Sequence, residues 1–305
     1  MNAVQLRGVT KTFGTQKAVD DLSLSVPEGS VYGFIGPNGS GKTTTLRMIM
    51  HIFHPDCGEI EVLGKRREEA DTDQVGYLPE ERGLYRRMKV KDVLRFYGEL
   101  KNGRNTASEV RAWLQKMELS GWADKKVEAL SKGMSQKVQF IAAVVAKPKL
   151  LILDEPFSGL DPVNADVLRE AVLDLRRDGV TVIFSTHDME VAETLCDFIF
   201  MIHQGRKVLD GSLKDIQAHY GADTLRIEVE GDGAFLEKVD GVLGTRDFGR
   251  TQELKLAPGT DPQQVLYEAL KRDRVRHFEI MEPSLHDIFI RIVKDGVTEE
   301  VTAHA

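Results

Sequence analysis

A glycine-rich stretch between residues 36 and 43 carries the clearest chemistry in the sequence. It reads GPNGSGKT, which satisfies the pattern G-x-x-x-x-G-K-[ST], and it lies between the β-rich run Val31–Ile35 and a helical stretch, 44–50. Glycines allow a tight turn whose backbone N–H groups point at phosphate oxygens, and a helix N-terminus adds its positive end. The motif therefore predicts a binding site for the phosphates of a nucleoside triphosphate. The expected binding residues are Gly36, Asn38, Gly39, Ser40, Gly41, Lys42, Thr43 and Thr44.

Within this loop two side chains have distinct expected roles. Lys42 supplies the positive charge for the β- and γ-phosphates, and the hydroxyl of Thr43 is expected to bind Mg²⁺. The predicted cofactors are therefore ATP and Mg²⁺.

Two adjacent carboxylates follow the apolar run Leu150–Leu153. Asp154 and Glu155 come at the carboxyl end of this predicted strand, which is the edge where ligands bind in open α/β sheets. We expect Asp154 to join the Mg²⁺ shell and Glu155 to face the attacking water as its base. Taken alone, such a pair is more often a helix cap or a solvated pair, but its combination with the phosphate loop favours catalysis.

The elements that must position these residues alternate between β-rich runs and helical patterns. Short apolar runs at 31–35, 150–153, 180–185 and 198–203 predict a mainly parallel α/β sheet. Residues 90–129 lack a buried-strand pattern and carry apolar residues at helical spacing, which predicts a helical subdomain over about 85–145. Ser212 and Asp215 form a capping box for a short helix that stops at Gly221. We therefore expect a first domain over 1–220 and a second over 221–300.

The second domain is predicted to be a small α+β fold. Alternating apolar residues indicate strands at 225–229, 254–256 and 278–280, with helices near Ala234 and after Asp261. Ser284 and Asp287 cap a last helix, in which Leu285, Ile288, Phe289 and Ile292 line one face. The order approximates βαββαβ plus a helix, which is ferredoxin-like, and contains no catalytic constellation.

Composition limits the class of protein. The 305 residues carry 41 Lys and Arg against 48 Asp and Glu, a net charge of −7, and 41% are hydrophobic. These values disfavour a nucleic-acid-coating protein and a disordered chain. The longest apolar run, 140–146, is far shorter than the ~20 residues of a membrane helix, so we expect a soluble intracellular chain. Cys57 and Cys196 form neither a disulfide framework nor a zinc set, and both are expected to be buried.

Three further segments resemble motifs of the nucleotide-binding subunit of an ABC transporter, over about residues 3–220. Residues 130–134, LSKGM, look like the LSGGQ signature, 158–161, SGLD, resemble the D-loop, and 185–188, STHD, resemble the switch-histidine segment. Each also has a local interpretation. Ser131 could cap the following helix, Asp161 could cap the helix that begins at Pro162, and a lone His187 is usually structural.

The resemblance implies an α/β P-loop ABC ATPase core with an inserted helical subdomain, in which two copies of the chain sandwich two ATP molecules. Ser131 and Gly133 would then face the γ-phosphate held by the opposite copy, next to Asp161, and His187 would contact the γ-phosphate or water. Phe13 resembles the aromatic side chain that stacks on adenine. Glu80 stands where the family usually has a glutamine. Its carboxylate can ligate Mg²⁺ directly or through water while adding charge beside the phosphates.

The segments 77–85 and 282–289, together with the LSKGM form of the signature at 130–134, are similar to bacterial export ATPases of the ABC-2 type. Those ATPases are related to sodium-extrusion subunits and carry an extra C-terminal domain. This similarity implies an ATP-hydrolysing subunit that powers export through a separate integral membrane permease, docked near residues 85–100. Such a subunit is cytoplasmic and peripheral at the inner face of the membrane, with no nucleic-acid partner. The transported substrate cannot be read from the chain.

Two alternatives remain. A soluble ABC ATPase acting on ribosomes or DNA is disfavoured by the single nucleotide domain, the lack of a coiled-coil insertion and the absence of a basic excess. A nucleotide-sensing regulatory subunit with little turnover is disfavoured because Lys42, Asp154, Glu155 and His187 are all present.

Overall fold

The computed structural model describes residues 1–66, 72–81, 83–221, 224–257, 259–281 and 283–295. The chain divides into two compact units, Met1–Ser212 and a second unit that begins at Leu213. The short helix before Gly221, assigned to the first domain from sequence, thus lies in the second unit.

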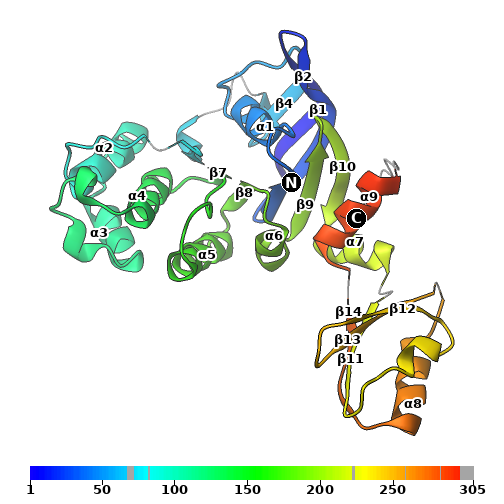
Figure 1. Cartoon of the computed structure of the whole chain (residues 1–305). Helices are drawn as coiled ribbons and strands as arrows, with labels where there is room; N and C mark the ends of the chain where they lie inside the picture. The colour runs from blue at the N-terminus through cyan, green and yellow to red at the C-terminus, as the bar shows by residue number, and fades with distance from the viewer. Residues whose placement is uncertain (67–71, 82, 222–223, 258, 282, 296–305) are drawn as a thin grey trace. The chain divides into compact units, whose positions relative to one another are not determined.

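The first unit contains two sheets (Figure 1). The smaller is antiparallel, with the order β2-β1-β4-β5, and comprises β1 (Asn2–Phe13), β2 (Gln16–Pro27), β4 (Cys57–Val62) and β5 (Lys65–Arg66). The larger has the order β10-β9-β3-β8-β7-β6. Its strands are β3 (Val31–Ile35), β6 (Val75–Leu78), β7 (Leu150–Asp154), β8 (Thr181–Thr186), β9 (Phe198–His203) and β10 (Arg206–Ser212).

The larger sheet is parallel apart from β10, as the apolar runs predicted. Because β3, β7 and β8 run in one direction, the chain leaves all three at the same edge. Ile35 pairs with Thr186, and Asp154 pairs with Ser185. The phosphate loop, the paired carboxylates and the histidine segment therefore emerge side by side.

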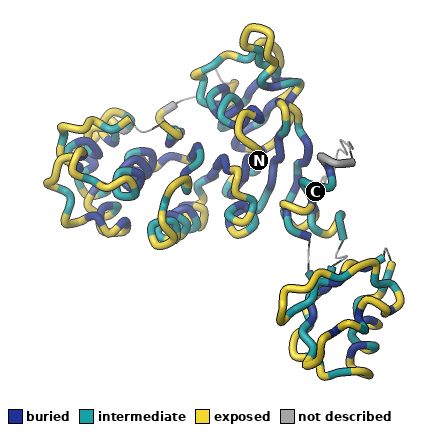
Figure 2. The backbone as a smooth tube through the Cα atoms, in the orientation of Figure 1, coloured by how far each residue is buried: buried dark blue, intermediate teal, exposed yellow. Residues whose placement is uncertain are grey.

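Helices pack against the two sheets of the first unit. Helix α1 (Lys42–Ile49) contacts strands of both sheets, and one hydrophobic core joins side chains from the two sheets and this helix. The strands β7, β8 and β9 are almost wholly buried, which Figure 2 shows in dark blue. The remaining helical elements of the core are η2 (Thr72–Gln74), α5 (Pro162–Arg177) and α6 (Met189–Leu195).

The expected helical subdomain is confirmed between β6 and β7. It consists of α2 (Val90–Asn102), α3 (Ala107–Lys116), the short 3₁₀ turns η3 (Ser120–Trp122) and η4 (Val127–Ala129), and α4 (Lys132–Val144). Helix α4 packs on α2 and α3 and also on β6. The subdomain is thereby attached to the parallel sheet beside β7, the strand that carries the two carboxylates.

The second unit has the strand order β12-β13-β11-β14, with every neighbouring pair antiparallel. Its elements are α7 (Leu213–Tyr220), β11 (Thr224–Val229), η5 (Leu236–Lys238), β12 (Val242–Asp247), β13 (Gln252–Leu256), α8 (Pro262–Arg272), β14 (Val275–Met281) and α9 (Leu285–Asp295). The helix expected near Ala234 is only the 3₁₀ turn η5. Leucines and valines of the sheet pack on Val265 and Ala269 of α8 to form a separate core.

The predicted cap of the last helix is confirmed. Ser284 Oγ accepts a hydrogen bond from the Asp287 N–H at 3.1 Å and donates to Oδ2 of Asp287 at 2.6 Å. Leu285, Ile288 and Ile292 are buried, whereas Phe289 is half-buried.

The two cysteines differ in exposure. Cys196 is buried as expected, but the expectation for Cys57 was wrong, because this side chain is exposed. Cys57 begins β4, whose first three residues lie outside the core, and only Ile60 and Val62 of this strand reach it. Among the helices of the described residues, none has the length and apolar character needed to cross a membrane.

Candidate nucleotide site

The phosphate loop is shaped by two close backbone approaches. A Cβ atom at Gly36 would lie 2.2 Å from the carbonyl oxygen of Ile202, and one at Gly41, where φ is +110°, would lie 2.5 Å from that of Ala18. Any side chain at either position would push the loop off its neighbouring strands. The glycines are therefore required for the loop to lie against the ends of β9 and β2.

Lys42 is held at the centre of the loop. Its side chain is 6% exposed, and Nζ donates to the carbonyl oxygens of Gly36 at 2.7 Å and Pro37 at 3.2 Å. Nζ also lies 3.7 Å from Oε1 of Glu155. Burial lowers the pKa of Lys42, while the charges of Glu155 and Asp154 oppose that shift. The loop thus presents a partly desolvated cation, which favours binding of an anion.

Asp154 has the environment of a metal ligand. The residue is 1% exposed, and Oδ1 accepts hydrogen bonds from Ser185 Oγ at 2.6 Å and Thr43 Oγ1 at 3.1 Å. Its other oxygen, Oδ2, is buried without a hydrogen-bond partner in the described structure. An unpaired buried carboxylate oxygen is costly unless a cation or a water satisfies it. The pair of a carboxylate and a hydroxyl therefore fits Mg²⁺, which prefers oxygen ligands.

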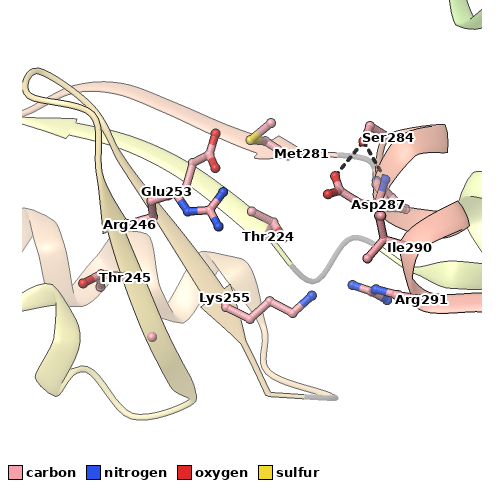
Figure 3. Close-up of a pocket in the computed structure, with 12 residues that line it drawn as sticks. Thr224, Thr245, Arg246, Glu253, Lys255, Met281, Ser284, Asp287, Ile290 and Arg291 are labelled. Atoms are coloured by element: carbon pink, nitrogen blue, oxygen red, sulfur yellow. Dashed lines mark hydrogen bonds between the residues drawn. The ribbon is translucent and has the colours of Figure 1, made fainter. Parts of the chain in front are cut away.

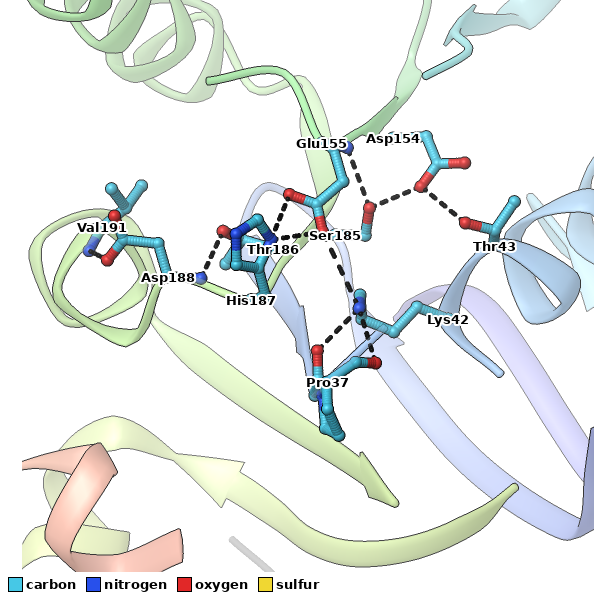
Figure 4. A network of polar contacts seen from close by, with 11 residues as sticks. Pro37, Lys42, Thr43, Asp154, Glu155, Ser185, Thr186, His187, Asp188 and Val191 are labelled. Carbon is cyan, nitrogen blue, oxygen red and sulfur yellow. Dashed lines mark hydrogen bonds and ion pairs between the residues drawn. The ribbon is translucent and has the colours of Figure 1, made fainter. Parts of the chain in front are cut away.

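Glu155 faces away from this oxygen pair (Figure 4). Its N–H donates to Ser185 Oγ at 2.9 Å, and its φ of +50° turns the chain out of the strand. His187 Nδ1 lies 3.1 Å from Oε2 and 3.2 Å from Oε1 of the buried carboxylate. Glu155 is consequently held between an imidazole and the ammonium of Lys42.

Ser185 links the carboxylate of Asp154 to the backbone of Glu155, and no separate role was predicted for it from the sequence. Its hydroxyl donates to Asp154 and accepts from the backbone of Glu155. The available signal was the hydroxyl groups of Thr181, Ser185 and Thr186 in a fully buried strand, since buried polar groups are hydrogen-bonded.

A cavity of about 440 Å³ connects the loop with residues from distant parts of the chain. Its lining includes Phe13 and Glu80 together with Lys42, Thr43 and Glu155. This volume is within the range of small-molecule sites. The structure therefore brings Phe13 and Glu80 to the phosphate loop, as expected from the sequence, and adds Gln16 and Ala18 to the same wall.

Ser131, Gly133 and Asp161 lie at the N-termini of two helices. Ser131 caps α4, accepting from Met134 N–H at 3.2 Å, and Asp161 caps α5, accepting from Asn164 N–H at 3.0 Å. A Cβ at Gly133 would lie 3.2 Å from Nδ2 of Asn164, so the two helix ends are adjacent. None of the three lines the 440 Å³ cavity of the same chain.

The second unit has a cavity of its own, of about 600 Å³ (Figure 3). Charged side chains of both signs line it, including Arg246, Lys255 and Glu253. Glu253 is bonded to Arg226 at 2.8 Å. The lining includes no residue for which the sequence predicted ATP or Mg²⁺ chemistry.

This combination of a parallel sheet, a glycine loop and paired carboxylates defines a nucleotide-hydrolysing cassette, and the comparisons with known proteins identify its family. Residues 19–158 match the ABC transporter family, and residues 211–293 match the family described as ATP-binding protein DrrA1-3-like, C-terminal domain. The chain belongs to the ATP-binding subunits of ABC transporters, with a DrrA-like C-terminal domain, and is an ATPase of that family.

Relatives match over nearly the whole chain. It is 44% identical over 287 residues to the uncharacterized ABC transporter ATP-binding protein YhaQ of Bacillus subtilis (strain 168), covering 93% of this chain and 96% of that protein. It is 33% identical to Nod factor export ATP-binding protein I of Rhizobium sp. (strain N33), with 95% and 96% covered. A solved ATP-binding subunit of an ABC transporter superposes with a TM-score of 0.66 at 31% identity, covering 72% of this chain and 93% of that one. The fold and family expected from the sequence are thus confirmed.

Proposed function

We propose that this chain hydrolyses ATP to power export of a substrate through a separate membrane permease, at the cytoplasmic face of the membrane. The observation that carries the hydrolysis is the position of Glu155, between Lys42 and His187 at the rim of the phosphate loop. Export is supported by the relatives named for Nod factor export and linearmycin resistance. In this proposal the unit Met1–Ser212 forms the nucleotide domain, and the unit that begins at Leu213 forms an accessory domain.

ATP binding uses the cavity beside the loop. The ring of Phe13 is 45% exposed and stacks on adenine through its exposed surface. Phe53 packs on it in a T-shaped contact with 5.3 Å between ring centroids, and Lys11 Nζ lies 5.6 Å from the centroid of the Phe13 ring. The phosphates bind the backbone N–H groups of residues 36–44, and Lys42 turns its ammonium toward them.

Mg²⁺ is held by Thr43 and Asp154, with Glu80 directly or through water. Among the described residues no three His, Cys, Asp or Glu side chains are grouped to enclose a metal ion. Mg²⁺ commonly keeps waters and takes substrate phosphates as ligands, so two or three protein groups are sufficient. When bound, the ion neutralises charge that develops on the phosphates.

Hydrolysis requires a base beside the γ-phosphate. Glu155 accepts a proton from the water whose oxygen attacks the γ-phosphorus, and ADP leaves as the bond to the bridging oxygen breaks. His187 orients the carboxylate through the contact of Nδ1 with both of its oxygens.

A second copy of the chain completes each site. Ser131, Gly133 and Asp161 lie outside their own chain's nucleotide cavity, at two adjacent helix N-termini. The positive end of α4 suits the γ-phosphate bound by the other copy. We therefore propose a dimer with two ATP molecules between the chains.

The permease docks on an exposed aromatic cluster of the helical subdomain. Tyr85, Phe96 and Tyr97 are in mutual ring contact, with centroids 5.6 to 6.3 Å apart, and Leu100 on the same helix as Phe96 is exposed. Exposed apolar groups gathered in one place are typical of interaction sites.

Two experiments test this function. In Glu155→Gln, the carboxamide keeps the shape but cannot accept the proton, so the variant should bind ATP, hydrolyse it very slowly and run as a dimer on sizing chromatography with ATP and Mg²⁺. A monomer with wild-type turnover would contradict the catalytic assignment.

The second experiment tests export. Phe96→Glu should keep ATP binding and basal hydrolysis but lose co-purification with the co-expressed permease, whereas Arg95→Glu on the same helix serves as a surface control. Recovery of the wild-type chain with ribosomes or DNA rather than membranes would favour the soluble alternative.

A further inference from the structure

The chain reverses direction immediately after α1, and the residue at the turn is a histidine. Ile52 N–H donates to Arg47 O at 2.8 Å, His51 N–H donates to Met48 O at 3.0 Å, and His51 has φ of +58°. A helix usually ends in this left-handed conformation with glycine, because a Cβ atom makes it costly. The turn therefore fixes the backbone at His51.

This turn places two imidazoles together. His51 Nε2 lies 3.2 Å from His54 Nδ1, and the rings are nearly perpendicular, with centroids 4.4 Å apart. Zinc binds imidazole nitrogen at about 2.0 to 2.1 Å, so two nitrogens at this separation would subtend roughly 100° at the ion. That angle is near the tetrahedral value. His51 is half-buried and His54 is exposed, so the pair can be reached from solvent.

We propose that His51 and His54 form a two-ligand site for a divalent transition-metal ion that accepts imidazole, such as Zn²⁺ or Ni²⁺. Mg²⁺ does not belong to this class of ion, because it prefers oxygen ligands. The described residues offer no third His, Cys, Asp or Glu side chain close enough to complete the set. This site is separate from the Asp154 pair.

The site would act on the nucleotide cavity through the segment 51–56. Phe53 lies between the two histidines in sequence and contacts Phe13 edge to face. Asp56 accepts hydrogen bonds from Thr12 N–H at 2.7 Å and Lys11 Nζ at 2.8 Å, at the end of β1. A metal ion that clamps this segment would restrict the ring of Phe13. Only this consequence depends on the adenine role proposed above.

Isothermal titration of the nucleotide-free, tag-free full chain with Ni²⁺ or Zn²⁺, in excess Mg²⁺, tests the site. We expect one ion per chain. His54→Ala and His51→Asn should each weaken metal binding by at least about tenfold, because loss of even an outer-shell partner of a metal ligand costs roughly that much affinity. Asn tolerates the left-handed turn, so the second variant keeps the backbone. His277→Ala, an exposed histidine of the other unit, should bind as the wild type does.

Absence of binding, or binding that survives both variants, would overturn the site and leave only a hydrogen bond between the imidazoles. If titration confirms the site but the ion leaves ATP affinity unchanged, the link to Phe13 is wrong and the proposed ATPase function is unaffected.

Discussion

Removing the hydroxyl of Ser185 tests whether the two carboxylates are positioned by one buried group. Ser185→Ala deletes the 2.6 Å bond to Asp154 and leaves the N–H of Glu155 without its 2.9 Å acceptor. A hydrogen bond to a charged group contributes about 2 kcal/mol, and an unpaired buried donor costs about 1 kcal/mol or more. We therefore expect the free energy of unfolding to fall by about 3 kcal/mol. Turnover should fall as well, since both carboxylates lose a restraint.

Urea denaturation followed by circular dichroism measures the stability, and ATP hydrolysis at saturating ATP and Mg²⁺ measures the turnover. Ser23→Ala is the matched control, because Ser23 Oγ accepts a 2.9 Å bond from Gly8 N–H at an exposed position. That control should change stability by less than about 1 kcal/mol and leave hydrolysis intact. If Ser185→Ala unfolds like the control and hydrolyses ATP like the wild type, Ser185 does not organise the site.

Three further predictions concern separate parts of the chain. Lys42→Ala should lose affinity for a fluorescent ATP analogue, because it removes the one side-chain cation among the loop's backbone donors, and unchanged affinity would refute the phosphate site. A chain cut after Gly221 should still bind and hydrolyse ATP while remaining folded by circular dichroism, and a folded truncation that cannot bind ATP would show that the second unit completes the site. Hydrogen bonds from Ser108, the backbone and Lys147 lower the pKa of Glu109 to about 2 from 4.5, so its stabilisation is present above pH 4.5 and is lost as the pH falls through about 2. Glu109→Gln should therefore unfold more readily than the wild type at neutral pH, with the difference disappearing in acid titrations near pH 2, and a difference that persists there would contradict the shift.

The parallel sheet could be predicted from sequence because its strands are continuous apolar runs bounded by polar residues. The run at 150–153 corresponds to β7, which extends only one residue further, to Asp154. The antiparallel sheet of β1 and β2 was not predicted. Residues 21–26 of β2 do alternate, with Leu22, Leu24 and Val26 buried and the residues between them exposed, so this strand could have been found. In β1 the pairing shifts register between Leu6 and Val9, which interrupts the alternation that reveals a half-buried strand.

The candidate site likewise contains residues that could be assigned from the sequence and residues that could not. The phosphate loop is contiguous in sequence, so its residues could be named together. Ser185 could not be assigned to the carboxylates because its position depends on the register that pairs it with Asp154, 31 residues away. Likewise, Phe13 lines the same cavity as the phosphate loop only because the tertiary fold brings the two together.

The different roles of Asp154 and Glu155 depend on the backbone rather than on strand alternation. The chain leaves β7 at Glu155 in a left-handed conformation, which directs one carboxylate to Thr43 and the other to Lys42 and His187. Lys42 is thereby shared between loop carbonyls and Glu155. Phosphates that bind the loop compete for its ammonium, so we expect ATP to draw Nζ away from Glu155 and leave His187 as the partner of the base. A structure of Glu155→Gln with ATP and Mg²⁺ tests this exchange, and Lys42 still contacting residue 155 rather than the phosphates would refute it.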